Sequence, residues 1–548
     1  MSSPVTSTRR ADAAVLRRIW RLHFWVALFA APVLVVLALS GLVILYSQPI
    51  DHLLNRNLLV VAEGSRTIPL DEQVAVAQQQ VGADYRLDAV TPPDAANHST
   101  RVDFLPANAP GYPQGESNLT EVFVNPYTGE YLGQRSALSG LVGLANQTHR
   151  MFGNDGPKIL LPSLGHLVNP SDYPNATIPV GLGNLWMEVT AVWILVLLGS
   201  GLYLWWPRAI EGAKPVLKVR WHKGGRIRWR DMHALTGVII AVILICYILS
   251  GLTWSRYWGE NWRAFSATVA PGLSVDAPST PATMGDYDRL GRRIAWAATN
   301  DPVYASQSGG PVAVPLSLAD IDRIAKDEHM VPGYAIIPPT NSTADGETTY
   351  GSYAVVNAWP QRLSEQRTLY LDQFTGQTIA NATAAQDGAL SRATSFGIAM
   401  HMGNQMGVLT RISATVACLG VLTMIATGLL MWWKRRPAGT TGLPSHANAA
   451  TRAETPRRAR VAVAVIAVAL GVLYPAFGVS LLVVVAVEGV LSLRSKSGKI
   501  GELSIGRLRI DDELADAREV PVGRPVRGAG VDATAEDGDD AMPTEAPH

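Results

Sequence analysis

The sequence is poor in cysteine and in charged residues, and each shortage excludes a class of protein. Only two of its 548 residues are cysteines, Cys246 and Cys418, and both lie inside apolar runs. There is therefore no disulfide framework, no cysteine-rich iron–sulfur spacing and no Cys-x-x-Cys-His motif for covalent haem attachment. Charged residues make up 17% of the chain against 48% hydrophobic ones, which is too apolar for an ordinary soluble protein.

Nucleotide-binding motifs are also missing. No Gly-x-Gly-x-x-Gly loop follows a strand-like run, and there is no P-loop. The chain is therefore not expected to take hydride from a nicotinamide by itself or to hydrolyse ATP. The net charge of +1 indicates no particular partner, and no nucleic acid is expected as one.

Long hydrophobic runs, in contrast, are abundant. A helix needs about 20 apolar residues to cross the roughly 30 Å hydrocarbon layer of a bilayer, and four runs meet this requirement. A fifth is interrupted by "YPAFG" around Pro475, which predicts one kinked span, two short spans or a re-entrant hairpin. The four runs are roughly Phe24–Tyr46, Leu185–Trp206, Leu235–Trp254 and Ile412–Trp433, and the fifth is Val461–Leu493.

The first run is expected to remain in the protein as an anchor. Arg17, Arg18 and Arg21 precede it, as basic residues precede the core of a signal peptide. The run is longer than the roughly 7–15 apolar residues of such a peptide, and no small-residue cleavage site follows it.

Basic residues near the ends of the runs predict the orientation. The N-terminal arm and the connectors after the second and fourth runs are rich in lysine and arginine, which places them in the cytoplasm. Residues 47–184 and 255–399 are then external. We expect a multi-pass protein of the bacterial inner membrane, with a cytoplasmic N-terminus and the lipid bilayer as its surroundings.

The two external stretches carry the same pattern in the same order. The first has "IPLDEQVAVAQQQVGADYRLDAVTPP" and later "EVFVNPYTGEYLG", and the second has "VPLSLADIDRIAKDEHMVPGYAIIPP" and later "RTLYLDQFTGQTIA". Each pattern predicts a helix followed by strands, with Thr-Gly supplying a turn. The first and third runs also end in the same "LSGL". A unit of span, external domain and span therefore occurs twice.

The expected fold is a membrane α-helical bundle with two external α+β domains, built by internal duplication. Four core transmembrane helices are joined by a C-terminal apolar helical region. The predicted segments are a cytoplasmic arm 1–19, span 20–46, first external domain 47–137, external helix and loop 138–184 with His149, span 185–206, basic connector 207–230, span 231–254, second external domain 255–390, helix end and span 391–433, connector 434–460, fifth region 461–493 and a polar, acidic, disordered tail 494–548.

The helix followed by "P-x-T-G" or "F-T-G" resembles the PepSY domain. The arrangement over roughly residues 15–495 is similar to the PepSY-associated transmembrane proteins, a group that includes inner-membrane ferric-siderophore reductases. The resemblance implies two external PepSY-like domains and a di-haem membrane protein that passes electrons to an iron complex on the outer side.

Four histidines occupy matched places in the two halves. His23 and His233 begin the first and third spans, so both are expected at the cytoplasmic face, whereas His149 and His401 precede the second and fourth spans at the external face. Pseudo-twofold packing would bring each pair face to face, and two facing imidazoles supply both axial ligands of a haem. We therefore expect two non-covalent b-type haems, with His23 and His233 on one and His149 and His401 on the other.

Alternative roles for these residues stay open. His166, in an insertion before the second span, is an alternative to His149 as ligand, and any single histidine at a helix end is equally well an interfacial residue. The glycines near the end of each span make room for a neighbouring helix or for a flat macrocycle. They are Gly41, Gly201, Gly251 and Gly428.

A continuous helix from His401 into the fourth span raises a difficulty. Arg411, a possible haem-propionate partner or a residue that reaches lipid phosphate, stands ten residues, or about 15 Å, beyond His401. The two haem levels would then lie about 30 Å or more apart. Either the macrocycles lean together or aromatic residues bridge the gap. The aromatic candidates are Trp25, Phe29, Trp193 and Tyr247.

A tryptophan cluster follows the third span. Trp254, Trp258 and Trp262 recur at helical spacing and so share one predicted face, with Arg256 and Arg263 nearby. An interfacial amphipathic helix explains the pattern. The alternative is a substrate-binding face of Trp258, Trp262 and Arg263 that cradles an anionic iron chelate.

The leading functional hypothesis is a haem-dependent oxidoreductase that reduces an external ferric siderophore or similar iron complex. Its electrons would come from a membrane quinol or a cytoplasmic flavoprotein. One alternative is copper or iron transport without redox chemistry, because Met400, Met402 and Met406 around His401 offer soft ligands for Cu(I). Another is an envelope regulator whose PepSY-like domains bind a peptidase. No catalytic residue is assigned.

Overall fold

The structure is a computed structural model. It describes residues 4–108, 119–152, 157–210, 217–222, 225–273, 275–288, 293–307, 313–344, 346–437, 439–444 and 456–490. Internal contacts divide the chain into Met1–Leu481 and Leu482–His548, and each unit is described by itself. Of the second unit, residues 482–490 continue a helix. The predicted disordered tail lies outside the described residues.

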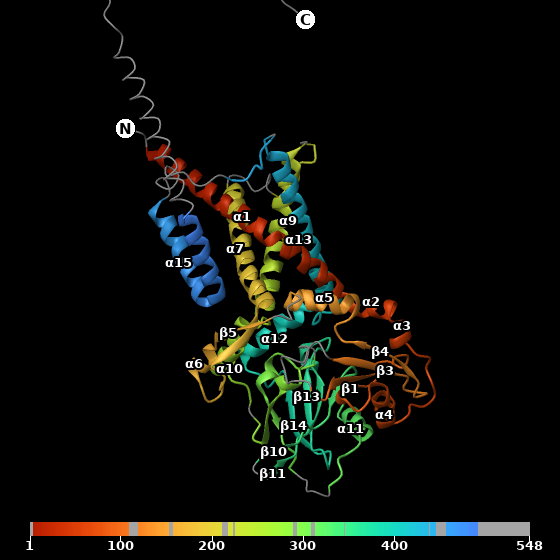
Figure 1. The fold of residues 1–548 in the computed structure, drawn as a ribbon. Helices are drawn as coiled ribbons and strands as arrows, with labels where there is room; N and C mark the ends of the chain where they lie inside the picture. Colours follow the sequence, from red (N-terminus) through yellow and green to blue (C-terminus); the bar gives the residue numbers. More distant parts are fainter. Residues whose placement is uncertain are drawn as a thin grey trace, which may run out of the picture. The chain divides into compact units, whose positions relative to one another are not determined.

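Among the described residues, four helices are long and apolar enough to cross a membrane, as predicted. Within them, α1 packs against α7 and α13, and α9 packs against α7 and α13, so the four form a closed bundle (Figure 1). The helices are α1 (Pro4–Leu45), α7 (Leu182–Ile210), α9 (Arg226–Leu252) and α13 (Val408–Arg435). Their apolar spans are Ala14–Leu45, Leu182–Trp206, Arg226–Leu252 and Val408–Arg435.

Two shorter helices lie against one end of this bundle and carry two of the candidate histidines. Helix α5 (Gly140–Met151) packs against α1, and α12 (Ala389–His401) packs against α9 (Figure 1). We call this the sheet end of the bundle, because α5 and α12 each follow directly on an edge strand of the large sheet described next. The two halves of the chain therefore present the same element at the same end.

The stretches between the spans form one antiparallel sheet of eight strands. Its order is β14-β13-β12-β9-β1-β2-β3-β4, so the first half of the chain supplies one side and the second half the other (Figure 1). The strands are β1 (Tyr85–Thr91), β2 (Thr100–Pro106), β3 (Thr120–Val124), β4 (Tyr131–Ser136), β9 (Ala335–Ile337), β12 (Tyr353–Asn357), β13 (Arg367–Leu371) and β14 (Thr378–Thr383).

The two halves join at the centre of the sheet instead of forming two separate external domains. Val90 of β1 pairs with Ile336 of β9, and the Asp71 carboxylate accepts hydrogen bonds at 2.9 Å from the amides of Leu318 and Ala319. Each half-sheet alone would leave the edge of β1 or β9 unpaired, and pairing the two edges satisfies both. The expectation of two independent domains is not confirmed.

Alternating side chains fill two cores, one on each face of the sheet. On one face, Val355 and its neighbours pack under the predicted helices, which are α4 (Leu70–Val81) and α11 (Leu318–Asp327). On the other face, Ala354 and Val356 pack against the segment that follows α10 (Trp258–Val269). That segment holds β7 (Ser279–Thr283), η2 (Met284–Tyr287), η3 (Ala297–Asn300) and β8 (Pro302–Tyr304).

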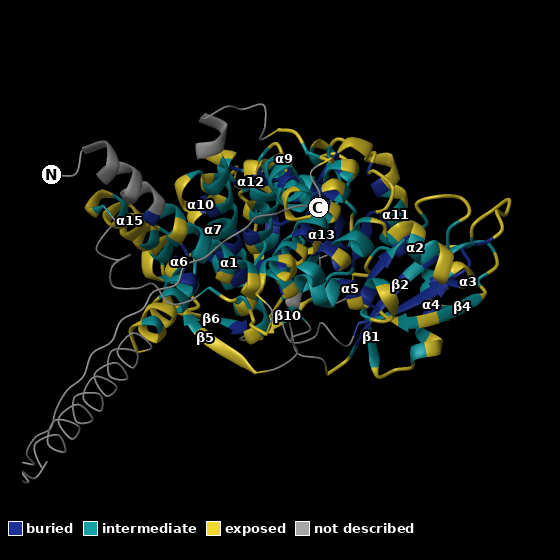
Figure 2. Ribbon diagram, turned by 90° about the horizontal axis from the view of Figure 1, so that it is seen from above, coloured by how far each residue is buried: buried dark blue, intermediate teal, exposed yellow. Residues whose placement is uncertain are grey.

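Smaller elements complete the fold. Figure 2 shows β5 as exposed, and its hairpin with β6 forms most of the insertion ahead of α7. The remaining elements are α2 (Ser47–Leu54), α3 (Arg56–Leu59), β5 (Lys158–Pro162), α6 (Leu164–Val168), β6 (Thr177–Gly181), β10 (Ser342–Ala344), β11 (Glu347–Thr349) and η4 (Leu363–Glu365).

The fifth apolar region consists of two short helices. Helix α15 (Arg457–Leu473) ends at Tyr474, and a second apolar helix runs over Pro475–Val490. The backbones of Gly471 and Gly478 lie in contact at the bend. Tyr474 and Phe477 are buried against Trp193 and its neighbours. The break lies at Tyr474 and Pro475, as the "YPAFG" interruption predicts, and the choice among the three arrangements stays a prediction.

Candidate functional site

The four candidate histidines meet in two pairs, as their spacing predicts. The ring centroids of His23 on α1 and His233 on α9 are 6.4 Å apart. Those of His149 on α5 and His401 on α12 are 6.2 Å apart. Each pair thus takes one residue from each half of the chain and brings together residues 210 or more positions apart in the sequence.

All four rings are seated in the same way. The Nδ1 atom of each lies 2.9–3.1 Å from a backbone carbonyl oxygen and from the hydroxyl three residues later on a neighbouring helix. A carbonyl oxygen only accepts, so Nδ1 donates and the lone pair is left on Nε2. The contacts are His23 with Leu197 and Ser200, His149 with Leu37 and Ser40, His233 with Met424 and Thr427, and His401 with Tyr247 and Ser250.

The hydroxyls hold a fixed orientation because each also donates to its own helix. Ser200 donates to the carbonyl of Leu197, and Thr427 donates to that of Thr423. Ser40 and Ser250 make the equivalent bonds to Val36 and Cys246. Each hydroxyl oxygen is then free to accept from the histidine, so the seating also fixes the tautomer of the ring.

A glycine follows each of these hydroxyl residues and makes room for the ring. A Cβ atom added at Gly41, Gly201 or Gly251 would stand 3.0–3.2 Å from Cε1 of the facing histidine, closer than nearly all real Cβ contacts. At Gly428 the same distance is 3.6 Å, an ordinary contact. At three of the four positions a side chain would therefore push the histidine back by a few tenths of an ångström, and glycine avoids this.

The hydroxyl residues are the part of the site that the sequence pattern did not predict. Their signal is a Ser-Gly-Leu or Thr-Gly-Leu triplet in every span. The four triplets begin at Ser40, Ser200, Ser250 and Thr427. The glycines are recognisable in the sequence because they recur near the span ends. The hydroxyl residue before each glycine, which orients the histidine, is not recognised in this way.

The spacing of each pair fits two imidazoles on opposite sides of one metal centre. A metal–nitrogen bond is about 2 Å long and the ring centroid lies about 1 Å further, so opposite ligands place their centroids about 6 Å apart. In the described part of the chain, no group of three or more His, Cys, Asp or Glu side chains is arranged to hold a metal ion. Each of these two pairs offers two imidazoles, which is the donor set that a bis-histidine haem requires.

A large cavity surrounds the pair at the sheet end. It has a volume of about 1240 Å³ and includes both His149 and His401. Residues at equivalent positions of the two halves line it, so the two sides of the cavity match. The matched residues are Leu34 and Leu244, Leu37 and Tyr247, Ala38 and Ile248, Gly41 and Gly251, Ala191 and Cys418, and Ile194 and Val421.

Burial keeps this histidine pair neutral. Desolvation, with His401 as a second cause, lowers the pKa of His149 to about 4, and desolvation also lowers the pKa of His401. A neutral imidazole with Nδ1 protonated presents its Nε2 lone pair, the form that binds a metal.

The two pairs are closer together than a continuous helix would place them. Helix α12 ends at His401, and α13 begins only at Val408, after a turn in which Gly403, Gln405 and Gly407 have positive φ. The turn brings His401 back to the level of Tyr247 and Ser250 on α9. His233 lies 14–17 residues before those two, or roughly 21–26 Å along the helix. The continuous helix on which the estimate of about 30 Å or more depended is therefore not present between His401 and Val408.

A comparison with protein-family models matches residues 20–435 to the PepSY-associated TM region. The chain belongs to this family. None of the curated proteins with which the chain was compared matches it. The matched range contains both histidine pairs, all four glycine seats and the whole eight-stranded sheet of this PepSY-associated protein.

Among the proposed bridging aromatics, only Tyr247 touches a candidate histidine in the PepSY-associated protein. Its ring centroid is 5.3 Å from that of His401. Trp25 and Phe29 are exposed on the outside of the bundle, and Trp193 packs against Phe477 of the fifth region. None of these three lines the cavity around His149 and His401. Of the four aromatic candidates, Tyr247 is therefore the one that lies beside this histidine pair, and the bridging role stays a prediction.

Of the three tryptophans expected to share a face, Trp254 lines the cavity and Trp258 and Trp262 do not. Trp258 and Trp262 stack at 5.2 Å, and Trp258 packs on Tyr474. Neither lines the cavity, although Arg263 does. The helical spacing correctly predicts that these two share a face, and through Trp258 that face contacts the fifth apolar region. Trp254 precedes α10 and instead packs against Trp359.

His166 lies outside the cavity lining, whereas Arg411 is part of it. The Nδ1 atom of His166 is 2.8 Å from the carbonyl oxygen of Tyr173, on the insertion, and His166 is outside the cavity lining. His149, not His166, therefore faces His401 in the structure. Arg411 lies in the first turn of α13 and lines the cavity together with His401, where it is available to an anionic group of a bound ligand.

Proposed function

We propose that this protein is a di-haem membrane oxidoreductase that passes electrons across the bacterial inner membrane to an external ferric complex. The observation that carries the proposal is the arrangement of four histidines in two pairs at two levels of a four-helix bundle. Within each pair the two rings face one another and are held by the same kinds of contact. The matched seats also support an origin of the two halves by internal duplication. The haems would be non-covalent and b-type, since no Cys-x-x-Cys-His motif exists for attachment.

Charge distribution supports an orientation with the sheet outside. Arg17, Arg18 and Arg21 precede the apolar part of α1, and α13 ends at Lys434 and Arg435. Lysine and arginine near span ends favour the cytoplasmic side. His23 and His233 would then lie near the cytoplasm, where a quinol or a separate flavoprotein donates, and His149 and His401 near the exterior.

A haem with two imidazole ligands supplies one-electron transfer by cycling between ferric and ferrous iron. The chain's own residues supply the rest. The hydroxyl and carbonyl partners fix each ring, the glycines let it approach, and the apolar bundle excludes water. Tight, pre-oriented seating on both sides disfavours loss of a ligand, so the site suits electron transfer and not the binding of an exchangeable small ligand.

The cavity supports a bulky acceptor at the sheet end. Its volume of about 1240 Å³ exceeds the roughly 300–1,000 Å³ of ordinary small-molecule pockets, so it has room for a macrocycle and further space beyond it. That further space is lined by side chains of both charge signs, among them Arg150, Arg256 and Glu260. A ferric chelate such as a siderophore is the proposed acceptor. One electron per ferric ion would release the more weakly held Fe(II).

The test is a redox titration of the purified protein in lipid nanodiscs. We expect two low-spin haems per chain in the visible spectrum. After anaerobic reduction with stoichiometric dithionite, addition of a ferric hydroxamate should reoxidise both haems and yield two Fe(II), trapped by a coloured Fe(II) chelator. A colourless protein from haem-replete cells, or reduced haems that the ferric complex leaves reduced, would contradict the proposal.

The glycine seats allow a matched comparison within one histidine pair. Gly201→Ala places a Cβ 3.0 Å from Cε1 of His23, which must shift, whereas Gly428→Ala meets His233 at 3.6 Å, an ordinary contact. We expect Gly201→Ala to lower occupancy of the haem at this pair and Gly428→Ala to retain it. Haem content per chain, measured for both variants, checks this, and equal losses would show that the ring contact is not the cause.

A further inference from the structure

A third histidine pair lies in the wall of the same cavity. His52 on α2 and His98 in the loop before β2 have ring centroids 4.7 Å apart, with their planes at 65°. Both residues line the cavity that holds His149 and His401. From sequence alone, His52 and His98 are expected to be surface residues, because they lie in the loops and external domains and not at the ends of the spans.

The spacing of this pair differs from the other two in an informative way. Two imidazoles at right angles on one metal ion have centroids about 4.5 Å apart, and at the tetrahedral angle about 5 Å. The observed 4.7 Å lies between these values. The pairs at 6.2 and 6.4 Å match ligands on opposite sides of a metal instead. His52 and His98 therefore fit adjacent positions on a single ion, with other positions left open.

Hydrogen bonding prepares one ring for such a role. The Nδ1 atom of His98 donates to Oδ1 of Asp94 at 2.6 Å, which leaves the lone pair on Nε2. A carboxylate behind a histidine in this way orients the ring and raises its basicity as a metal ligand. Within the described residues, neither ring nitrogen of His52 has a hydrogen-bond partner, so both remain available.

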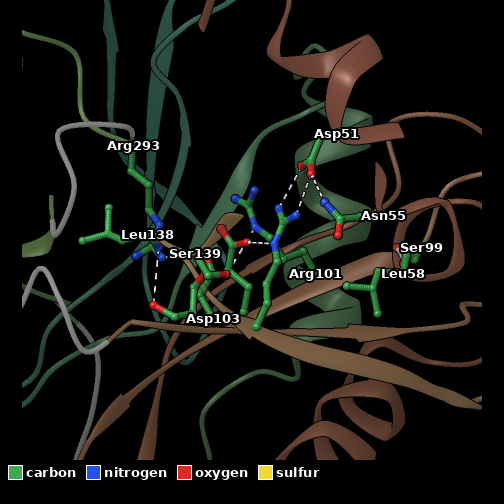
Figure 3. A network of polar contacts seen from close by, with 12 residues as sticks. Asp51, Asn55, Leu58, Ser99, Arg101, Asp103, Leu138, Ser139 and Arg293 are labelled. Carbon is green, nitrogen blue, oxygen red and sulfur yellow. Dashed lines mark hydrogen bonds and ion pairs between the residues drawn. The ribbon is translucent and has the colours of Figure 1, made fainter. Parts of the chain in front are cut away.

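Contacts of the neighbouring residues hold the backbone that carries each of the two rings. Beside His52, Asp51 makes a two-pronged ion pair with Arg135 at 2.7 and 2.9 Å and accepts a hydrogen bond from Asn55 (Figure 3).

The segment that carries His98 is tied down as well. His98 forms a β-bridge with Val60, and the Ser99 hydroxyl donates to the carbonyl of Leu58 at 2.7 Å. Figure 3 shows Leu58 and Ser99 beside the Asp51 cluster. The two imidazoles are thus held close together before any ion binds, which lowers the cost of forming a site.

We propose that His52 and His98 bind one divalent transition-metal ion in the cavity wall, with water completing its coordination. Imidazole suits Fe(II), Zn(II), Cu(II) and Ni(II), whereas Mg(II) and Ca(II) prefer oxygen ligands. The assignment of Fe(II) as the occupant rests on the proposed function. In that case the site receives the ion that one-electron reduction of the chelate releases, before the ion leaves the cavity.

The test is calorimetric titration of the full-length protein with Zn²⁺ alone, since Zn²⁺ binds imidazole and is not redox-active. We expect one site per chain that His52→Ala or His98→Ala weakens at least about tenfold, and Asp94→Asn less, as for a residue behind a ligand. His222→Ala is the matched control, because it removes an exposed imidazole that does not line the cavity. It should leave the affinity unchanged.

The haem spectrum of each variant is recorded alongside. Wild-type haem content in His52→Ala and His98→Ala shows that the fold is retained, so a loss of Zn²⁺ binding is then local. Unchanged Zn²⁺ affinity in both variants, or an equal loss in His222→Ala, overturns the metal site and leaves the pair as a ring contact only. The two proposals fail in different ways. Absence of haem from the wild-type spectrum contradicts the proposed oxidoreductase function. The metal site is judged only by the difference in Zn²⁺ affinity between the wild type and the His52→Ala and His98→Ala variants.

Discussion

Replacing either His149 or His401 with alanine is expected to remove the same one of two haems. Each ring supplies one side of a bis-histidine site, and the centroid separation of 6.2 Å leaves no described side chain between them to take over. Haem content should fall from about two per chain to about one, with the loss of one low-spin component from the reduced spectrum. Reduction of an external ferric chelate should fall to the level of protein-free controls.

The double variant separates a shared site from two independent ones. If His149 and His401 hold one haem, the double alanine variant should retain about one haem per chain, no less than either single variant. His23→Ala and His233→Ala should remove the other haem, and a variant with one histidine removed from each pair should lose both. His166→Ala should retain both, since His166 contacts Tyr173 and not the cavity. Additive losses from His149→Ala and His401→Ala would contradict the pairing.

The histidine pairs could be predicted from sequence because they rest on periodicity and order. Spans are recognisable from apolar length, and a repeated "LSGL" after a histidine marks equivalent positions in the two halves. Pseudo-twofold packing brings such equivalent positions face to face. The pairing of His23 with His233 and of His149 with His401 could therefore be predicted without any knowledge of distances. The same logic predicted a helix followed by strands in each half of the sheet.

Features that depend on short irregular segments could not be predicted. The level of His401 is set by a six-residue turn, Met402–Gly407, whose positive φ values at Gly403, Gln405 and Gly407 are not encoded in any periodic pattern. If α12 and α13 formed one straight helix, His401 would lie farther from His233 than the level of Tyr247 and Ser250. The fusion of the half-sheets depends on β9, only three residues long, which gives too short an alternation to reveal its neighbour.

The tryptophans show a different limit. Periodicity fixes which side chains share a helix face but not what that face contacts. Trp258 and Trp262 do share one, and from it Trp258 packs on Tyr474, more than 200 residues later, while Trp262 donates a hydrogen bond to Thr394. His52 and His98 show the converse, because nothing in the sequence relates two histidines 46 positions apart, and only the folding of α2 against the loop before β2 brings them to 4.7 Å.

Arg293→Met is expected to destabilise the sheet strongly, because it removes a buried charge. Arg293 is 8% exposed and pairs with Asp88 on β1 and, at 2.6 Å, with Asp103 on β2. Figure 3 shows Arg293 beside Asp103 at the edge of the polar cluster. Asp88 occupies a bulge in β1, where the pairing register with β2 shifts between Leu87 and Ala89, and the bulge lets its carboxylate reach the same guanidinium as Asp103.

Removing the guanidinium takes a buried cation from two carboxylates that are 3% and 2% exposed, while Asp103 keeps its ion pair with Arg101 at 3.2 Å. Breaking a buried ion pair from one side typically costs about 3–5 kcal/mol, because the remaining charge stays desolvated. For a unit of this size, that corresponds to a drop of roughly 3–5 °C in the apparent melting temperature. Thermal unfolding in detergent, followed by tryptophan fluorescence, measures it.

Arg323→Met is the matched control, since Arg323 is 64% exposed and pairs with Asp320 and Asp327 on the surface of α11 at 3.6 and 3.5 Å. That change should cost less than about 1 kcal/mol. Because Arg293 lies in the second half of the chain and both of its aspartates in the first, a large effect at Arg293 alone would establish that the joined sheet is held by this charge cluster as well as by the short β1–β9 pairing. Equal, small effects would mean that the two halves are held together without it.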